Sequence, residues 1–325
     1  MIANPPSWAN IYFDPKEIAS RAHFATEHGQ IDAWFRQTPG QDGIFGRTAF
    51  AEEASGDPGE WLVVCDEPPA GLRTRIPVER RVLFLGEPPS IKIYPTPYLN
   101  QFGLVVGPFA LPGYEGCHIR QHASLPWHYG RSRPFSWREL AADKVKSRTI
   151  SVFCSSKKLT VQQAFRIRFV EALKAHFGPR IEHFGHGFRP IEEKADGLSP
   201  FRYTIVLENN LTEGFWTEKL ADAYLAGCFP IYAGGKIPAE DFDPRARLDI
   251  DVFKVGDSLR AIEDLIGTAD FDALSNSVRE QRRRVMLQHN LFAVAERLIE
   301  VRRDRAGLLA RPASVLRSQD ARLTP

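Results

Sequence analysis

Polar side chains suited to binding a charged, hydroxyl-bearing ligand gather between residues 201 and 235. Lys219 offers a positive charge, Glu218 beside it can accept hydrogen bonds from hydroxyls, and Thr217 can cap a helix that starts there. The first amides of a helix point free N–H groups outward, and the helix dipole favours an anion at that end. A ligand with both phosphate and sugar hydroxyls, that is a nucleotide diphosphate, fits this pair. An ordinary surface Glu–Lys pair on a helix fits the pattern equally well.

The elements that must position these groups form one predicted βαβ unit. Residues 203–207 are a continuous apolar run, typical of a strand buried on both faces of a parallel sheet. A helix is expected over 218–226, ended by Gly227, and a second apolar strand over 228–232. Ligands of such units bind outside the carboxyl ends of the strands, which is where Glu208, Asn209 and the helix start are expected to lie.

Two glutamates are candidates for a general base. Glu87 and Glu67 each follow a predicted strand and precede two prolines, in the sequences GEPP and DEPP. Proline lacks an N–H, so the local backbone hydrogen-bonds these carboxylates poorly and each could accept a proton from a hydroxyl. The local pattern does not separate the two.

Arg166 is a second candidate cation for phosphate. It lies in the second turn of a predicted helix, one position off the apolar face, and its guanidinium can hold two phosphate oxygens at once. The neighbouring Arg168 has the same chemistry. Taken alone, this pattern favours a solvated helix charge for Arg166 over a phosphate-binding residue.

No metal site is predicted. Residues 241–243 and 249–251 both spell D-x-D, a spacing that can hold Mg²⁺ or Mn²⁺ on a diphosphate. The first precedes a proline in a predicted loop, and the second alternates along a predicted strand, so neither is expected to bind a cation. The four cysteines include no C-x-x-C pair and are expected to be buried thiols.

Composition narrows the classes of function. A net charge of +2 over 325 residues gives no global basic field, so no nucleic-acid partner is expected. The first residues show no leader pattern, and no apolar run reaches the ~18 residues of a membrane helix, so a cytoplasmic protein is expected. Residues 282–325 contain ten arginines and four acidic residues. We expect residues 282–299 to pack on the protein, and residues 300–325 are the candidate segment for peripheral contact with an anionic membrane.

The stretch ENNLTEGFWTEKLADAYLAGCFPIYAGG resembles the signature of the α-1,3-fucosyltransferases, glycosyltransferase family 10. The resemblance extends over roughly residues 60–260 and includes FLGEPPSIKIYPTPYLNQFGLVV around Glu87. It implies a GT-B fold, with two Rossmann-like domains facing a central cleft, and inverting transfer of L-fucose from GDP-fucose to a glycan hydroxyl without an obligatory metal or other cofactor.

The resemblance also implies residue roles. Glu87, with Glu67 as the alternative, is the base, and Arg166 with Lys219 holds the diphosphate. Asn209 and Glu218 match positions that hold the nucleotide and its ribose. At Phe215 the family often has tyrosine, so another GDP-sugar stays open as donor, as does a non-catalytic glycan- or nucleotide-binding protein. The implied acceptor is an oligosaccharide or lipid-linked glycan.

The expected domains are an acceptor-side domain over 1–146, a nucleotide-sugar domain over 147–299 and a basic tail over 300–325. Helices are predicted over 18–35, 261–266 and 278–299, and strands over 61–65, 82–85, 104–106, 149–154, 181–184 and 248–253.

Overall fold

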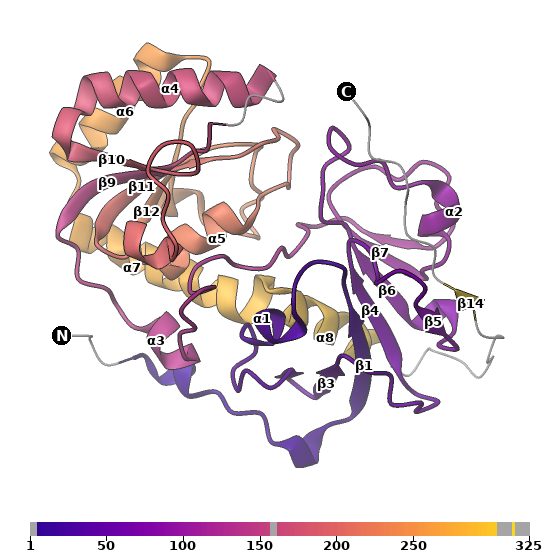
Figure 1. Cartoon of the computed structure of the whole chain (residues 1–325). Coiled ribbons are helices and arrows are strands. Elements are labelled where there is room, and N and C mark those ends of the chain that lie inside the picture. The colour runs from indigo at the N-terminus through magenta and orange to yellow at the C-terminus, as the bar shows by residue number, and fades with distance from the viewer. Residues whose placement is uncertain (1–4, 157–160, 304–313, 316–325) are drawn as a thin grey trace. The chain divides into compact units, whose positions relative to one another are not determined.

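The computed structural model describes residues 5–156, 161–303 and 314–315, and the chain divides into two compact units. The N-unit comprises Ile11–Pro126 and His289–Pro325, and the C-unit comprises Met1–Asn10 and Trp127–Gln288. Each unit contains its own largely parallel sheet with helices (Figure 1). The α/β class predicted from the sequence is therefore confirmed.

The C-unit is built on a five-stranded sheet of order β10-β9-β11-β12-β13, in which all neighbours are parallel. In Figure 1 this sheet lies between α4 and α6 on one side and α5 and α7 on the other. The elements are β9 (Arg148–Phe153), β10 (Ile181–Phe184), β11 (Phe201–Leu207), β12 (Phe229–Ala233), β13 (Leu248–Asp249), α3 (Trp137–Ala141), α4 (Val161–Phe177), α5 (Glu218–Leu225), α6 (Val255–Thr268) and α7 (Phe271–Arg284).

The predicted βαβ unit forms as expected at the centre of this sheet. In β11 every residue but Arg202 is buried, and β12 is buried throughout, so both strands are covered on both faces. Helix α5 is capped by Thr217 and ends before Gly227, whose φ of 72° is a left-handed conformation that favours glycine. This geometry brings the end of β11 and the start of α5 to the same edge of the sheet.

A buried carboxylate on α5 anchors the helix to the loop that opens the C-unit. Asp222 is 0 % exposed and accepts hydrogen bonds from the amides of His128 and Tyr129, each at 2.9 Å. Its second oxygen pairs with Lys194 Nζ at 2.6 Å. The charge of Asp222 is thereby compensated, and the start of α5 is held in one position relative to its surroundings.

The N-unit is built on a seven-stranded sheet of order β2-β3-β1-β4-β6-β7-β8. All neighbours are parallel except β2 and β3. The elements are β1 (Ser20–Ala25), α1 (Ile31–Phe35), β2 (Ile44–Phe45), β3 (Thr48–Ala51), β4 (Trp61–Cys65), β6 (Arg81–Phe84), α2 (Thr96–Leu99), β7 (Leu104–Val106), β8 (Cys117–Ile119) and α8 (Leu291–Arg302), with a separate pair of β5 (Arg73–Thr74) and β14 (Ser314–Val315).

The predicted helix over 278–299 is wrong, because it is interrupted and its two parts belong to different units. Helix α7 gives way to a π-helix over Val285–His289, and Asn290 then caps α8 by accepting from the Ala293 amide at 2.9 Å. The ring of Phe292 packs in the N-unit, with centroids 5.0–5.7 Å from three aromatic rings: Phe24, Phe35 and Phe50. Apolar periodicity continues through both helices, so it does not reveal the break.

Two further sequence predictions need correction. The predicted helix over 18–35 is instead strand β1 followed by the short helix α1, because the run SRAHFA is buried at five of its six positions between β3 and β4. The predicted strand over 248–253 is only two residues long. The division into compact units falls at Trp127, and the chain returns to the N-unit at His289.

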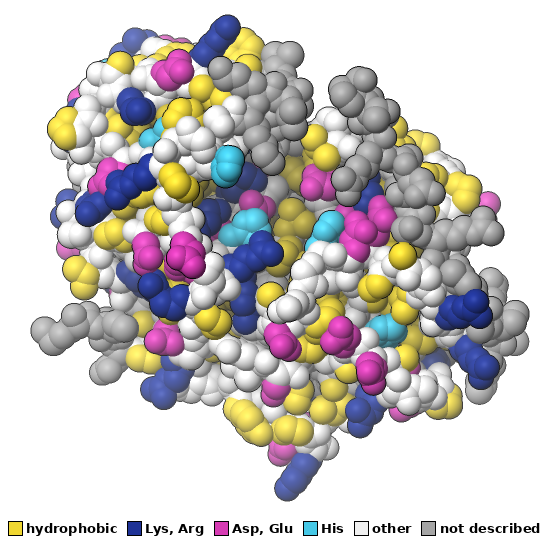
Figure 2. Space-filling view, viewed as in Figure 1, with side chains coloured by type: hydrophobic (Ala, Val, Ile, Leu, Met, Phe, Trp, Pro, Cys, Tyr) yellow, Lys and Arg dark blue, Asp and Glu magenta, His cyan; other side chains and the backbone are white. Residues whose placement is uncertain are grey.

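The described residues contain no helix long and apolar enough to cross a membrane. On the face shown in Figure 2, acidic and basic side chains are interspersed, in keeping with the small net charge. Of the predicted basic tail, residues 304–313 and 316–325 lie outside the described part of the chain. Its contact with membranes stays a prediction.

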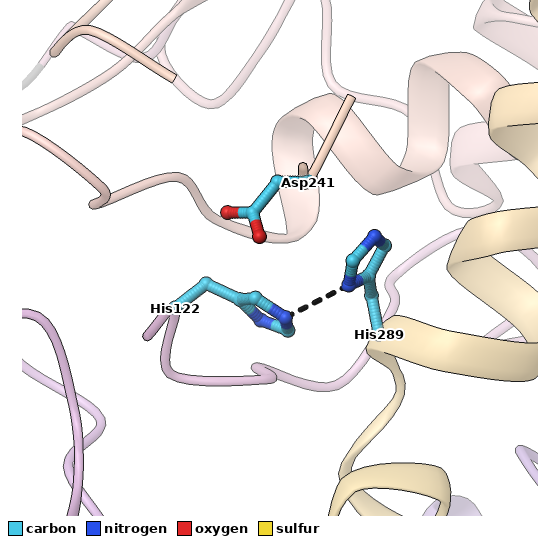
Figure 3. A group of neighbouring side chains, drawn as sticks. All are labelled: His122, Asp241 and His289. Carbon is cyan, nitrogen blue, oxygen red and sulfur yellow. Dashed lines mark hydrogen bonds between the residues drawn. The ribbon is translucent and has the colours of Figure 1, made fainter. Parts of the chain in front are cut away.

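A pair of buried histidines joins the start of the returning segment to the N-unit. His289 Nδ1 lies 2.9 Å from His122 Nε2 (Figure 3). The Ser124 amide donates to His122 Nδ1 at 3.2 Å, so the His122 proton sits on Nε2 and is donated to His289. Burial lowers the pKa of His122 well below its usual range, and the neighbouring His289 lowers it further.

This pair predicts a loss of stability in acid. In the unfolded chain His122 takes up a proton below about pH 6.5, whereas in the folded chain it stays neutral, so the unfolded state binds more protons as the pH falls. The free energy of unfolding should then fall by up to about 1.4 kcal/mol per pH unit below 6.5 on account of His122. Urea unfolding at pH 7.5, 6.5 and 5.5 measures how the free energy of unfolding changes with pH. A His122→Gln variant, which keeps an N–H donor but does not titrate, should show a shallower slope, and an equal slope would contradict the assignment.

Candidate functional site

The carboxyl end of β11 is attached to the start of α5 through the carboxylate of Glu208. The side chain is 0 % exposed. It accepts from the Thr217 amide at 2.9 Å and from the Thr217 hydroxyl at 2.8–2.9 Å. A buried carboxylate therefore already satisfies donors at the start of this helix, and it needs a counter-charge to be stable there.

Lys219 supplies that counter-charge. Its ammonium lies 3.0 Å from Thr217 Oγ1, 3.1 Å from Glu218 Oε1 and 3.4 Å from Glu208 Oε2. Burial opposes the charged forms of Glu218 and Lys219, but their attraction outweighs it. The pKa of Glu218 is held well below its usual range and that of Lys219 well above. Both side chains are therefore ionised at neutral pH.

Arg166 of α4 reaches the same edge of the sheet. Its Nη1 donates to the Leu207 carbonyl at 3.2 Å and to Asn209 Oδ1. The residue is 6 % exposed, and burial lowers its pKa. Its Nε is buried without a hydrogen-bond partner among the described residues. By contrast Arg168, the alternative considered from sequence, is exposed. The structure thus separates the two arginines that the sequence left open.

A cavity of about 330 Å³ opens at the carboxyl ends of β11, β12 and β13, within the range typical of small-molecule sites, ~300–1,000 Å³. Arg166 and Glu208 line it from one side, and Asp251 and Phe253 from the loop after β13. A Cβ at Gly235 would lie 2.0 Å from the Thr212 carbonyl oxygen, so glycine permits the close approach of the two loops that bound the cavity.

The charges of this site balance before any ligand is bound. Two carboxylates, Glu208 and Glu218, face two cations, Arg166 and Lys219. A diphosphate would add negative charge to this neutral cluster. It would be accommodated if Glu218 turned toward the sugar hydroxyls and released Lys219 toward the phosphate. Lys219 and Glu218, the pair predicted from the sequence, are therefore adjacent as expected. Without a ligand, however, they are ion-paired with each other.

Other residues predicted to take part have different surroundings. Phe215 is 2 % exposed, so its ring is part of the protein interior. Within the first D-x-D stretch, Asp241 accepts from Trp216 Nε1 at 2.9 Å and Asp243 caps a 3₁₀ turn through the Arg245 amide. These contacts give each aspartate a structural function in the fold.

The N-unit contains both candidate bases. Glu87 follows β6 and is exposed, and its amide donates to Tyr94 Oη at 3.0 Å. Glu67 follows β4, is 5 % exposed and pairs with Lys92. An exposed carboxylate can receive a proton from a substrate, whereas one that is buried against an ammonium is a poor candidate. The structure therefore favours Glu87.

Comparison with known proteins gives a consistent relationship. The chain is 34 % identical over 64 residues to the α-(1,3)-fucosyltransferase FucT of Helicobacter pylori, a match that covers 20 % of this chain and 13 % of that protein. It resembles the crystal structure of an α1,3-fucosyltransferase with GDP-fucose at a TM-score of 0.51 and 14 % identity, over 94 % of this chain and 97 % of that one. No family model matches.

A second likeness is weaker. The UDP-forming trehalose-phosphate synthase of Burkholderia vietnamiensis matches 77 % of this chain and 76 % of its own at a TM-score of 0.45 and 9 % identity. The findings confirm the resemblance of this chain to α-1,3-fucosyltransferases and the GT-B fold class expected from the sequence.

The ion cluster predicts energetic coupling between Glu208 and Lys219. Glu208→Gln and Lys219→Met should each destabilise the protein by about 2–4 kcal/mol, because each leaves a partly buried charge without its partner. The double variant should lose less than the sum, with a coupling of about 1–3 kcal/mol. Urea unfolding at pH 7 measures all four forms.

The exposed pair of Lys236 and Glu213, at 3.3 Å, is the matched control, and its double-mutant cycle should show almost no coupling. Strictly additive effects of Glu208→Gln and Lys219→Met would contradict the cluster.

Proposed function

We propose that the chain is an inverting glycosyltransferase that moves L-fucose from GDP-fucose to a hydroxyl of an acceptor glycan. The observation that carries the proposal is the ion cluster at the carboxyl edge of the C-unit sheet. Arg166 and Glu208 line a cavity there, and Lys219 contacts both Glu208 and Glu218. The resemblance of this chain to α-1,3-fucosyltransferases supports it, including a structure described with GDP-fucose.

The C-unit is assigned the donor. Arg166 and Lys219 would bind the diphosphate oxygens, and Glu218 and Asn209 would accept hydrogen bonds from the nucleotide and sugar. As the bond from sugar carbon to phosphate oxygen breaks, negative charge builds on the GDP oxygen. Two cations fixed in a partly buried site stabilise this charge more than water does, and the proposal requires no metal ion for that step.

The N-unit is assigned the acceptor. Its exposed Glu87 would take the proton of the attacking hydroxyl while that oxygen bonds to the sugar carbon from the face opposite the departing phosphate. Attack from the opposite face inverts the configuration at this carbon. The acceptor is proposed to be an oligosaccharide or lipid-linked glycan. It would be recognised at the carboxyl edge of the N-unit sheet, where Glu87 lies.

Nucleotide binding tests the assignment of the donor. In calorimetric titrations GDP should bind more tightly than UDP or dTDP, and GDP-fucose more tightly than GDP-mannose. Arg166→Ala should weaken GDP binding roughly 10- to 100-fold, because it removes hydrogen bonds to a charged group. Arg168→Ala, which alters an exposed arginine two positions away, should leave the affinity unchanged. Equal affinity for all three nucleotides would overturn the choice of GDP.

Turnover tests the assignment of the base. With labelled GDP-fucose and a panel of oligosaccharides, Glu87→Gln should lower kcat by ~10²–10⁴ while GDP affinity stays at the wild-type value. Glu115→Gln changes an exposed glutamate of the same unit and serves as control. Unchanged turnover in Glu87→Gln would remove Glu87 as the base. GDP binding without transfer to any acceptor would favour a binding protein over an enzyme.

A further inference from the structure

Three neighbouring strands of the N-unit sheet are followed by polar residues, and the carboxylate of the middle one, Asp66, links the other two. In the order β1-β4-β6, His28 lies three residues after β1, Asp66 directly follows β4, and Glu87 lies three residues after β6. The carboxyl ends of parallel strands share one edge of the sheet, where ligands of such sheets bind. Asp66 is thus between the other two in strand order.

Asp66 is buried and holds its neighbours through several bonds. It is 2 % exposed and has a left-handed φ of 64°, which few non-glycine residues adopt. Its carboxylate accepts from Tyr94 Oη, from Lys92 Nζ at 2.9 Å and from His28 Nε2 at 2.8 Å. Burial opposes its ionisation, but these three bonds outweigh that effect and lower the pKa of Asp66 to about 2. Through Tyr94 the same carboxylate also supports the Glu87 amide.

His28 presents the other side of its ring to solvent. Its side chain is 53 % exposed, although its backbone is fixed by the Thr26 hydroxyl at 3.1 Å and by Trp34 Nε1 at 2.7 Å. Because Nε2 donates to Asp66, the neutral ring leaves Nδ1 as an acceptor. Within the described residues Nδ1 has no hydrogen-bond partner.

We propose that His28 binds a hydroxyl group of the acceptor glycan through Nδ1, and that Asp66 is the residue that positions it beside the Glu87 turn. This inference rests on the proposed glycosyl transfer. The hydrogen bond that His28 Nε2 donates to Asp66 fixes the tautomer and the direction of the ring, in the manner that carboxylates orient histidines in other sites. The acceptor would then be held by two groups from one edge of the sheet, Glu87 at the attacking hydroxyl and His28 at another.

A divalent cation is the competing ligand for this cluster. One ligand atom each of Glu27, His28 and Asp66 lie within 4.8 Å of one another. However, the Lys92 ammonium already lies 2.9 Å from Asp66 Oδ2, the oxygen that His28 contacts, so a cation there would meet a positive charge. The geometry therefore favours a neutral, hydroxyl-bearing ligand.

Steady-state kinetics of His28→Gln tests the inference. Glutamine places an amide nitrogen where Nε2 lies and so keeps the bond to Asp66, but it has no acceptor at the position of Nδ1. The KM for the acceptor should rise about tenfold, with kcat within about threefold and GDP affinity unchanged. His176→Gln is the matched control, because it alters a similar imidazole–carboxylate pair, with Glu263 at 2.5 Å, in the C-unit. An unchanged KM, or a fall in kcat alone, would overturn the proposal.

The pH dependence tests the positioning by Asp66. The hydrogen bond that His28 donates to Asp66 raises the pKa of His28; nearby Glu27 acts in the same direction, while burial and Lys92 oppose it. Acceptor KM should therefore rise as the pH falls through the His28 pKa, with an inflection absent from His28→Gln. Asparagine tolerates a positive φ, so Asp66→Asn should keep the backbone conformation. Because it removes the negative charge beside His28, the inflection should move to lower pH. An inflection that stays in place would contradict the positioning role.

Nitrogen NMR of the histidine rings provides a readout independent of turnover. At high pH His28 should be in the tautomer with the proton on Nε2, and a proton on Nδ1 would overturn the inference. Failure of the proposed function can be told apart from failure of the His28 inference. If the wild-type protein does not bind GDP or does not transfer the sugar, both the proposed function and the His28 inference are overturned. GDP binding and transfer that persist while His28→Gln behaves as wild type would overturn the His28 inference alone.

Discussion

The burial of the Glu208 carboxylate between the end of β11 and the start of α5 is the constraint on which the C-unit site depends. A carboxylate with no exposed surface must be matched by donors and by a cation, and Thr217 and Lys219 provide them. The same bonds fix where α5 begins, and so where Glu218 and Lys219 lie. Stability and ligand chemistry are coupled here, since the ammonium assigned to the phosphate also neutralises the buried carboxylate.

The N-unit repeats this arrangement with different residues. Asp66 is buried at the end of β4, accepts bonds from three side chains and has Lys92 as its counter-charge. In both units a buried carboxylate at a strand end organises polar groups at the carboxyl edge of a parallel sheet. These groups differ in chemistry: they are cations and a glutamate suited to a nucleotide diphosphate in the C-unit, and a glutamate and an imidazole suited to hydroxyls in the N-unit.

The sequence predicted the parts whose signals are local. The apolar runs of β11 and β12, the Thr217 cap and the Gly227 ending are each encoded within a few residues, and they are found where expected. Strand β1 was missed because SRAHFA has little apolar character, and its burial comes from β3 and β4. The position of α8 depends on packing of Phe292 against residues more than 200 positions away.

Local sequence patterns likewise do not reveal which charged residues of the two sites are paired. The pairing of Lys219 with Glu208 as well as Glu218 depends on how the loop after β11 folds back onto the start of α5. The contact of His28 with Asp66, 38 positions away, depends on β1 and β4 being neighbours in the sheet. A crystal structure of the protein with GDP-fucose tests the central claim most directly. We expect the diphosphate within hydrogen-bond distance of Arg166 and Lys219, with Glu218 turned away from Lys219 toward the sugar hydroxyls. A diphosphate bound elsewhere, for example in the basic cavity of about 460 Å³ lined by Lys146, Arg202 and Arg282, would contradict it.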